Sequence, residues 1–248
     1  MERLREKRII VTGAGSGIGR AIALRFAAEE ARVVISDVDK EAASRVAAEA
    51  GGEANGETLV RKTDVTNSSE IETLVETSVE EWGGLDVMVN NAGIGVAGTT
   101  TDTTEEDYER VMDVCLRGTF LGMKHAIPAI RDSGGGSVIN MSSVAALVGI
   151  TDRAVYSAAK GAILAITRAA AIDHVEQGVR VNCIAPGTVD TPLDRPHHRR
   201  LRRSRRGAPE HASSPATWQA GHAGGNRRDG GLPRLRRIGI SDRGVHGR

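Results

Sequence analysis

Tyr156 and Lys160 have the spacing of a proton-transfer pair. They are four residues apart in a stretch with helical periodicity, so their side chains share one face of the expected helix. A phenol has an ordinary pKa of about 10, and a nearby ammonium group favours its ionised form. The pair could therefore act as a general acid and base near neutral pH. An ordinary Tyr/Lys pair on a helix surface has the same spacing.

A glycine-rich turn, TGAGSGIG, begins at Thr12 after an apolar run and leads into a helical stretch. Gly13, Gly17 and Gly19 would let the backbone approach a pyrophosphate, which the N–H groups at the start of the helix would bind. The spacing is G-x3-G-x-G and not G-x-G-x-x-G. The turn alone is therefore also compatible with a tight strand–helix connection that binds no ligand.

Asp37 follows a second apolar run, 18 residues after Gly19. A carboxylate at about this distance can accept hydrogen bonds from the adenosine ribose and repel a 2′-phosphate, which favours NAD over NADP. A solvated or helix-capping aspartate is the alternative, because a helical stretch begins just after Lys40.

Short β-branched runs alternate with stretches that have apolar residues at three- and four-residue spacing. This alternation predicts a parallel sheet with helices on both faces, and the apolar runs suggest strands buried on both sides. The expected strands are Lys7–Thr12, Arg32–Ser36, Leu59–Lys62, Leu85–Asn90, Ser137–Met141 and Val179–Ile184. The expected helices are Ile18–Ala28, Glu41–Ala50, Glu70–Trp82, Glu105–Ile130 and Val155–Glu176.

The composition narrows the class of protein. A chain of 248 residues suits one α/β domain. Its two cysteines exclude a disulfide framework, and Cys115 and Cys183 lack metal-ligand spacing. No apolar run approaches the roughly 18 residues of a membrane helix, and the N-terminal residues do not have the pattern of a signal peptide. We therefore expect a cytoplasmic protein with no membrane partner and no metal.

Four motifs in order resemble those of the short-chain dehydrogenases/reductases. They are TGAGSGIG at Thr12, NNAG at Asn90–Gly93, YSAAK at Tyr156–Lys160 and PG at Pro186–Gly187. The resemblance covers residues 7–192. It implies a Rossmann-like doubly wound parallel sheet and transfer of a hydride between a nicotinamide cofactor and a small alcohol or ketone. It also implies a homodimer or homotetramer, formed partly through the helices Glu105–Ile130 and Val155–Glu176.

The resemblance assigns roles to individual residues. Tyr156 would be the general acid/base, Lys160 would tune it and hold the nicotinamide ribose, and Ser143 would hydrogen-bond the substrate oxygen. A strand-end cap is the alternative role for Ser143. The expected cofactor contacts are Gly13, Ser16, Gly17, Ile18, Gly19, Asp37, Asp64, Val65, Asn91, Ala92, Gly93, Tyr156, Lys160, Pro186, Gly187, Val189 and Thr191.

Two positions bear on activity and substrate. The family usually has an asparagine, which supports a water in the proton relay, where this chain has Cys115. A thiol is a poor substitute for an amide, so we predict reduced activity.

Arg153 stands three residues before Tyr156. Together with PGTVDTP after the last expected strand, it resembles the branch that acts on hydroxy acids and sugar acids. Arg153 could grip a carboxylate or be a solvated loop arginine.

Residues 195–248 differ in kind from residues 1–194. The first part carries 19 Lys+Arg and 29 Asp+Glu, whereas the second carries 14 Arg, no Lys and 3 acidic residues. A coding sequence compatible with Gln219–His246, read one base later, gives KPGTPEEIAATVAYLASDESAYLTGVF, which resembles the family's C-terminus. We therefore expect a one-base frameshift close to Leu193–Arg195. The alternative is a basic nucleic-acid arm centred on Arg199–Arg206.

The frameshift has structural and functional consequences. Residues 1–194 would form an incomplete NAD-binding domain without its last strand, and residues 195–248 would form an arginine-rich disordered tail. The sequence thus predicts an NAD-dependent oxidoreductase acting on a secondary alcohol or ketone, with hydroxy acids and sugar acids among the candidates. The alternative is an inactive NAD-binding protein, impaired by Cys115 and by the altered C-terminus.

Overall fold

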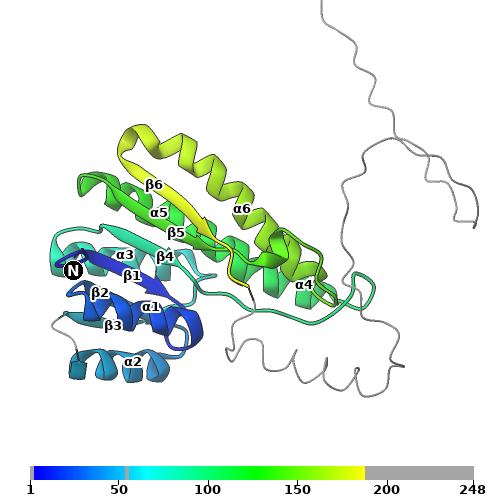
Figure 1. Cartoon of the computed structure of the whole chain (residues 1–248), viewed down its shortest axis with the longest axis horizontal. Coiled ribbons are helices and arrows are strands. Elements are labelled where there is room, and N and C mark those ends of the chain that lie inside the picture. Colours follow the sequence, from blue (N-terminus) through cyan, green and yellow to red (C-terminus); the bar gives the residue numbers. More distant parts are fainter. Residues whose placement is uncertain (1–2, 54–55, 188–248) are drawn as a thin grey trace, which may run out of the picture. The chain divides into compact units, whose positions relative to one another are not determined.

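A computed structural model describes residues 3–53 and 56–187 of the chain, and its strands form one parallel six-stranded sheet (Figure 1). The order is β3-β2-β1-β4-β5-β6, the doubly wound arrangement of a Rossmann-like fold. The expectation of a parallel α/β sheet is confirmed. The strands are β1 (Arg8–Thr12), β2 (Arg32–Asp37), β3 (Thr58–Lys62), β4 (Val87–Asn90), β5 (Gly136–Met141) and β6 (Val179–Ile184).

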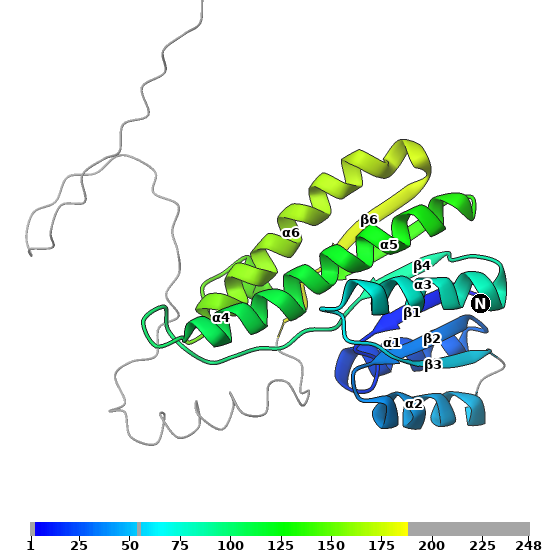
Figure 2. The same cartoon turned by 180° about the vertical axis from the view of Figure 1, so that it is seen from behind.

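Helices cover both faces of the sheet, as the view from behind also shows (Figure 2). On one face, Ile9 and Val33 pack with residues of α1 and α2. On the other, Ile10 and Val34 pack with residues of α3, α5 and α6. Adjacent strand residues serve opposite faces because the side-chain period of a strand is two. The helices are α1 (Gly17–Ala28), α2 (Lys40–Glu53), α3 (Ser68–Trp82), α4 (Glu105–Met112), α5 (Gly118–Asp132) and α6 (Ala154–His174).

The expected continuous helix Glu105–Ile130 is interrupted. A π-helical turn, η1 (Asp113–Arg117), separates α4 from α5. Such a turn inserts one residue into an α-helix and is often found at functional sites. The apolar periodicity of the sequence did not reveal it.

Burial of the outer strands differs from the expectation. β1 and β2 are buried along nearly their whole length. In β6, by contrast, Arg180, Asn182 and Ile184 are exposed, and β3 ends in two exposed residues. The prediction that all strands are buried on both sides is therefore wrong for β3 and β6. Both are edge strands of the described sheet.

One helical segment, Ala154–Gln177, is long and apolar enough to span a membrane by length and composition. The core helix of a soluble protein passes the same test, and this segment packs extensively against β6. Its buried residues Ile163 and Ala170 belong to hydrophobic clusters of the protein. The expectation that no apolar stretch approaches the length of a membrane helix is therefore wrong for this segment, of which 28% of the most apolar window is buried.

Arg8 and Asp86 form a partly buried ion pair where β1 begins and β4 is about to begin. The Nε and backbone N–H groups of Arg8 donate to one Asp86 carboxylate oxygen at 2.7 and 2.9 Å. Lys7 lies 3.5 Å from the other oxygen. Burial opposes ionisation of Asp86, but the hydrogen bonds from Arg8 and the charges of Arg8 and Lys7 outweigh it and lower the pKa of Asp86.

We expect Asp86→Asn to lower the free energy of unfolding at neutral pH by about 1–3 kcal/mol, the typical contribution of hydrogen bonds to a charged partner. Because the pKa of Asp86 is lowered in the folded protein, its stabilisation is present above the ordinary carboxyl pKa and is lost as the pH falls through the folded-state pKa. The difference between wild type and variant, measured by urea unfolding at several pH values, should therefore shrink in acid.

Asp132→Asn is the matched control, since Asp132 pairs with Arg131 in an exposed ion pair and such pairs contribute little. An equal loss in both variants, or a pH-independent effect of Asp86→Asn, would contradict the assignment.

Candidate active site

The predicted site residues meet in one cavity at the carboxyl ends of the strands. The cavity has a volume of about 920 Å³. It lies where the strand order reverses between β1 and β4, the position at which open α/β sheets bind ligands. Of the predicted cofactor and substrate residues, all but Gly19, Val189 and Thr191 line it. Val189 and Thr191 lie outside the described residues, as do residues 195–248.

The glycine turn is held against the end of β4 by backbone contacts. Gly13 has a φ of +62°, and a Cβ there would lie 2.8 Å from the Cα of Ala92. A Cβ on Gly19 would collide with the carbonyl oxygen of Gly13 and with the amide of Asn91. Glycine is therefore required at both positions. Gly19 supports the turn from behind and does not line the cavity.

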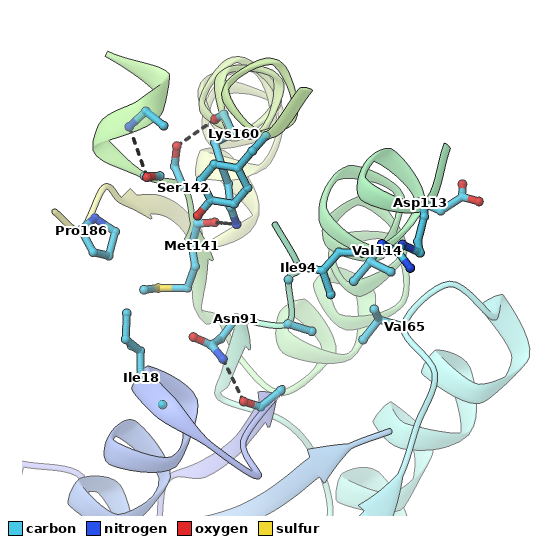
Figure 3. Close-up of a pocket in the computed structure, with 18 of the residues that line it drawn as sticks. Ile18, Val65, Asn91, Ile94, Asp113, Val114, Met141, Ser142, Lys160 and Pro186 are labelled. Atoms are coloured by element: carbon cyan, nitrogen blue, oxygen red, sulfur yellow. Dashed lines mark hydrogen bonds between the residues drawn. The ribbon is translucent and has the colours of Figure 1, made fainter. Parts of the chain in front are cut away.

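Asn91 fastens the two halves of the cofactor region together. Its side-chain Nδ2 donates to the carbonyl oxygen of Thr12 at 3.0 Å. It also donates to the carbonyl oxygen of Gly13 at 3.1 Å, the bond from Asn91 drawn in Figure 3. The Thr12 hydroxyl in turn accepts from the backbone N–H groups of Asn91 and Ala92. These four contacts leave the N-terminus of α1 facing the cavity, where its N–H groups and positive dipole end suit an anion.

Asp37 lines the cavity and does not cap α2. Its carboxylate accepts from the backbone N–H groups of Gly15 at 2.8 Å and Asp39 at 3.0 Å. Asp39 caps the helix instead, because its Oδ1 accepts from the N–H of Ala42 at 2.9 Å. The helix-capping alternative for Asp37 is therefore wrong, and its carboxylate stands at the edge of the glycine turn.

The loop after β3 forms another wall of the cavity through Thr63, Asp64, Val65 and Thr66. The backbone N–H of Asp64 donates to Glu70 at 2.7 Å, and the Asp64 carboxylate accepts from the N–H and hydroxyl of Thr66. Sequence reasoning missed Glu70. Its position three residues after the helix cap Asn67 is the signal that could have found it.

Lys160 joins α6 to the end of β5. Its Nζ donates to the carbonyl oxygen of Met141 at 2.7 Å, and the hydroxyl of Ser142 donates to the Lys160 carbonyl oxygen at 2.8 Å (Figure 3). Nζ lies 5.6 Å from the centre of the Tyr156 ring. Burial lowers the pKa of Lys160, and the thiols of Cys115 and Cys183 oppose that shift. Ser142 is a positioning residue that sequence reasoning did not assign.

Ser143 makes the capping contact that was the alternative role expected for it. Its Oγ accepts from the backbone N–H of Ala145 at 3.2 Å, which caps a short 3-10 turn. Because the oxygen is used as an acceptor there, the hydroxyl hydrogen can still be donated. Ser143 also lines the cavity together with Tyr156 and Lys160, so it can donate to a substrate oxygen.

Cys115 lies at the centre of η1 and is fully buried. Its Sγ donates to the carbonyl oxygen of Ile94 at 3.3 Å and accepts from the N–H of Ile94 at 3.4 Å. The thiol therefore makes one donor and one acceptor contact to the chain that follows β4. The thiol thus makes both kinds of contact that an amide could make there, but as a weaker donor and acceptor.

Arg153 is not a solvated loop residue. Only 6% of its surface is exposed, and it lines the cavity beside Tyr156. The solvated alternative is therefore wrong. Sequence reasoning also missed a charged helix face at the cavity. Glu106, Glu109, Arg110 and Asp113 line the cavity from α4 and η1, at a helical spacing that could have been recognised.

Comparison with known proteins identifies the family. The model of the short chain dehydrogenase family matches residues 7–201. Cyclohexanol dehydrogenase of an Acinetobacter species is 37% identical over 192 residues, 77% of this chain and 76% of that protein. Trans-4-hydroxycyclohexanecarboxylate dehydrogenase of Sinomonas cyclohexanicum is 39% identical over 197 residues, 77% of this chain and 76% of that protein.

The fold comparison agrees. A crystal structure of levodione reductase superimposes with a TM-score of 0.78 at 35% identity and covers 80% of this chain and 78% of that chain. The chain belongs to the short-chain dehydrogenase/reductase family. It is therefore related to NAD(P)-dependent oxidoreductases, as its motifs indicated.

We expect Cys115→Asn to raise turnover about fivefold, because an amide makes stronger hydrogen bonds than a thiol to the same two backbone groups of Ile94. Cys115→Ala, which removes both contacts, should lower turnover. Steady-state alcohol oxidation measures both, and melting temperatures show whether each variant is folded. A folded Cys115→Asn variant with no gain would refute the idea that the thiol limits activity.

Proposed function

We propose that the chain is an oxidoreductase that transfers a hydride between a nicotinamide cofactor and a secondary alcohol or ketone. One observation carries the proposal: Tyr156, Lys160 and Ser143 line a single cavity with the glycine turn, and the Lys160 ammonium lies 5.6 Å from the Tyr156 ring. This arrangement places a proton-transfer group, a cation and a hydroxyl donor at the carboxyl edge of the sheet.

Each side chain has a defined part in alcohol oxidation. The Tyr156 phenolate accepts the proton of the substrate hydroxyl, and the Ser143 hydroxyl donates a hydrogen bond to the reacting oxygen. Lys160 supplies positive charge that favours the phenolate. A nicotinamide cofactor held by the glycine turn and by Asn91 would supply the acceptor for the hydride that leaves the substrate carbon. In ketone reduction, Tyr156 returns its proton to the oxygen.

Asp37 supports NAD as the preferred cofactor. Its carboxylate lines the cavity and is fixed by two backbone N–H groups beside the glycine turn. A fixed negative charge there disfavours a second anion, such as a 2′-phosphate. The Asp64–Val65 wall would contact the adenine, and Pro186 and Gly187 the nicotinamide side.

A cyclic secondary alcohol is the substrate that the relatives favour. Cyclohexanol dehydrogenase and trans-4-hydroxycyclohexanecarboxylate dehydrogenase both bear the names of six-membered carbocyclic substrates. Ile94, Val144 and Ile150 give the cavity apolar surface, and the buried Arg153 adds a group that can bind a carboxylate. Hydroxy acids, including sugar acids, are therefore candidates beside neutral ring alcohols.

The family also suggests a cellular location and an oligomeric state for the protein. We propose a cytoplasmic homo-oligomer. Tyr108 of α4 and Phe120 of α5 are exposed apolar side chains on the helical segment that we expect at the contact between copies. A small-molecule substrate is the partner implied by the cavity, and we assign no membrane or nucleic-acid partner.

Residues 1–194 are proposed as the catalytic domain and residues 195–248 as an out-of-frame segment. The abrupt change from an acidic segment to an arginine-rich segment without lysine supports this boundary. Resequencing the coding DNA from codon 185 to the stop codon is the test. A missing or extra base near codon 194 is expected, and a confirmed reading frame would refute the frameshift.

We expect the purified chain to oxidise cyclohexanol and 4-hydroxycyclohexanecarboxylate, faster with NAD⁺ than with NADP⁺. Tyr156→Phe should lose about a thousandfold in turnover, because it removes the general acid and base, and should still bind NADH. Tyr108→Phe is the matched control, since Tyr108 is exposed and does not line the cavity.

Two outcomes would decide against this proposal. Retained turnover in Tyr156→Phe would remove that residue from the chemistry. Tight NADH binding by the wild type without turnover of any alcohol tested would favour an inactive NAD-binding protein.

A further inference from the structure

The backbone conformation around Arg153 directs its side chain toward the interior of the protein. Asp152 has a φ of +56°, an uncommon conformation for a residue other than glycine. Its carbonyl oxygen accepts from the N–H of Gly98 at 3.0 Å, and Gly98 forms an isolated parallel bridge with Arg153. The segment after β4 and the segment before α6 are thus joined at Arg153, whose side chain is 94% buried.

The Arg153 guanidinium and the Lys160 ammonium lie at equal distances from the Tyr156 ring. The Cζ of Arg153 is 5.7 Å from the ring centre and the Nζ of Lys160 is 5.6 Å from it. Gly95 leaves room for the Arg153 guanidinium and the Tyr156 ring, because a Cβ there would stand 2.9 Å from Nη1 of Arg153 and 3.6 Å from Cδ2 of Tyr156. Both distances are within the range at which a cation interacts with an aromatic ring.

Tyr156 lies in the first turn of α6. The positive end of the helix dipole favours negative charge there, so the helix itself also favours the phenolate.

We propose that Arg153 is a positioning residue for Tyr156, whose phenolate form it stabilises as a second cation beside Lys160. The inference rests on the proposed role of Tyr156 as the general acid and base. The two cations differ in one respect. Burial lowers the pKa of Lys160, so its charge is lost at a lower pH than that of an exposed lysine, whereas a guanidinium remains charged throughout. Arg153 supplies the permanent charge.

Other titratable groups surround this pair. The thiols of Cys115 in η1 and Cys183 in β6 act on Lys160. Glu106, Glu109, Arg110 and Asp113 face the same cavity from α4 and η1. Asp152, next to Arg153 in the chain, is partly buried. All of them are retained in the variants below, so a change in titration reports on Arg153.

Titration of the tyrosine absorbance tests the inference without cofactor or activity. The full chain has two tyrosines, and Tyr108→Phe leaves the Tyr156 signal alone. In this background Arg153→Gln should raise the midpoint of phenolate formation by about half to one and a half pH units. Arg153→Lys, which keeps a charge, should raise it by less. An unchanged midpoint in folded Arg153→Gln would overturn the proposal.

The pH profile of alcohol oxidation gives a second readout. With neutral cyclohexanol, the acid limb of kcat/KM should move to higher pH in Arg153→Gln by the same amount as the titration midpoint. A carboxylate clamp by Arg153 would instead raise KM for 4-hydroxycyclohexanecarboxylate alone. If the chain has no activity, the proposed function fails while the titration still decides this inference.

Gly95→Ala provides the test if Arg153→Gln does not fold. The added methyl group must displace the guanidinium from its contact beside Gly95 without changing the charge of the protein. The midpoint of Tyr156 should rise in this variant too, and an unchanged midpoint would overturn the proposal.

Discussion

The buried ammonium group of Lys160 is the contact on which the rest of the site depends. It donates to the last carbonyl of β5, and the backbone carbonyl of Lys160 accepts from Ser142 just beyond that strand. A buried cation without such a partner would cost several kcal/mol, so α6 cannot shift along β5 without losing stability. Tyr156 is one helical turn before Lys160 and Ser143 follows Ser142, so these two contacts also fix the reactive groups.

The cofactor side is held by a different kind of interaction. Four hydrogen bonds join the ends of β1 and β4, each between the side chain of Asn91 or Thr12 and a backbone group. Backbone partners are present whatever side chains surround them, and such a network is rigid when all its groups are satisfied. The two halves of the site are therefore fastened separately, each to the end of a central strand.

Sequence patterns predicted the strands closely because β-branched apolar runs mark buried strands well. The spacing of Tyr156 and Lys160 alone predicted that they share one helix face, and the family resemblance predicted their roles. Burial of Arg153 could not be predicted, since it depends on the positive φ of Asp152 and on a bridge to Gly98, far away in the sequence. The two hydrogen bonds of Cys115 depend in the same way on where the chain after β4 passes. The exposure of β6 reflects its place at the edge of the described sheet, which its own residues do not encode.

The π-helical turn η1 lets α4 and α5 direct their faces toward different parts of the protein. An α-helix advances about 100° per residue, so one inserted residue rotates everything after it by that angle. Before the turn, Glu106 and Glu109 face the cavity, and after it, Leu121 and Ile130 face the sheet. Removing one residue between Asp113 and Arg117 would leave the composition of both halves nearly unchanged and still turn the apolar stripe of α5 away from its strands. The number of residues in η1 therefore sets the rotation of α5 about the helix axis relative to α4.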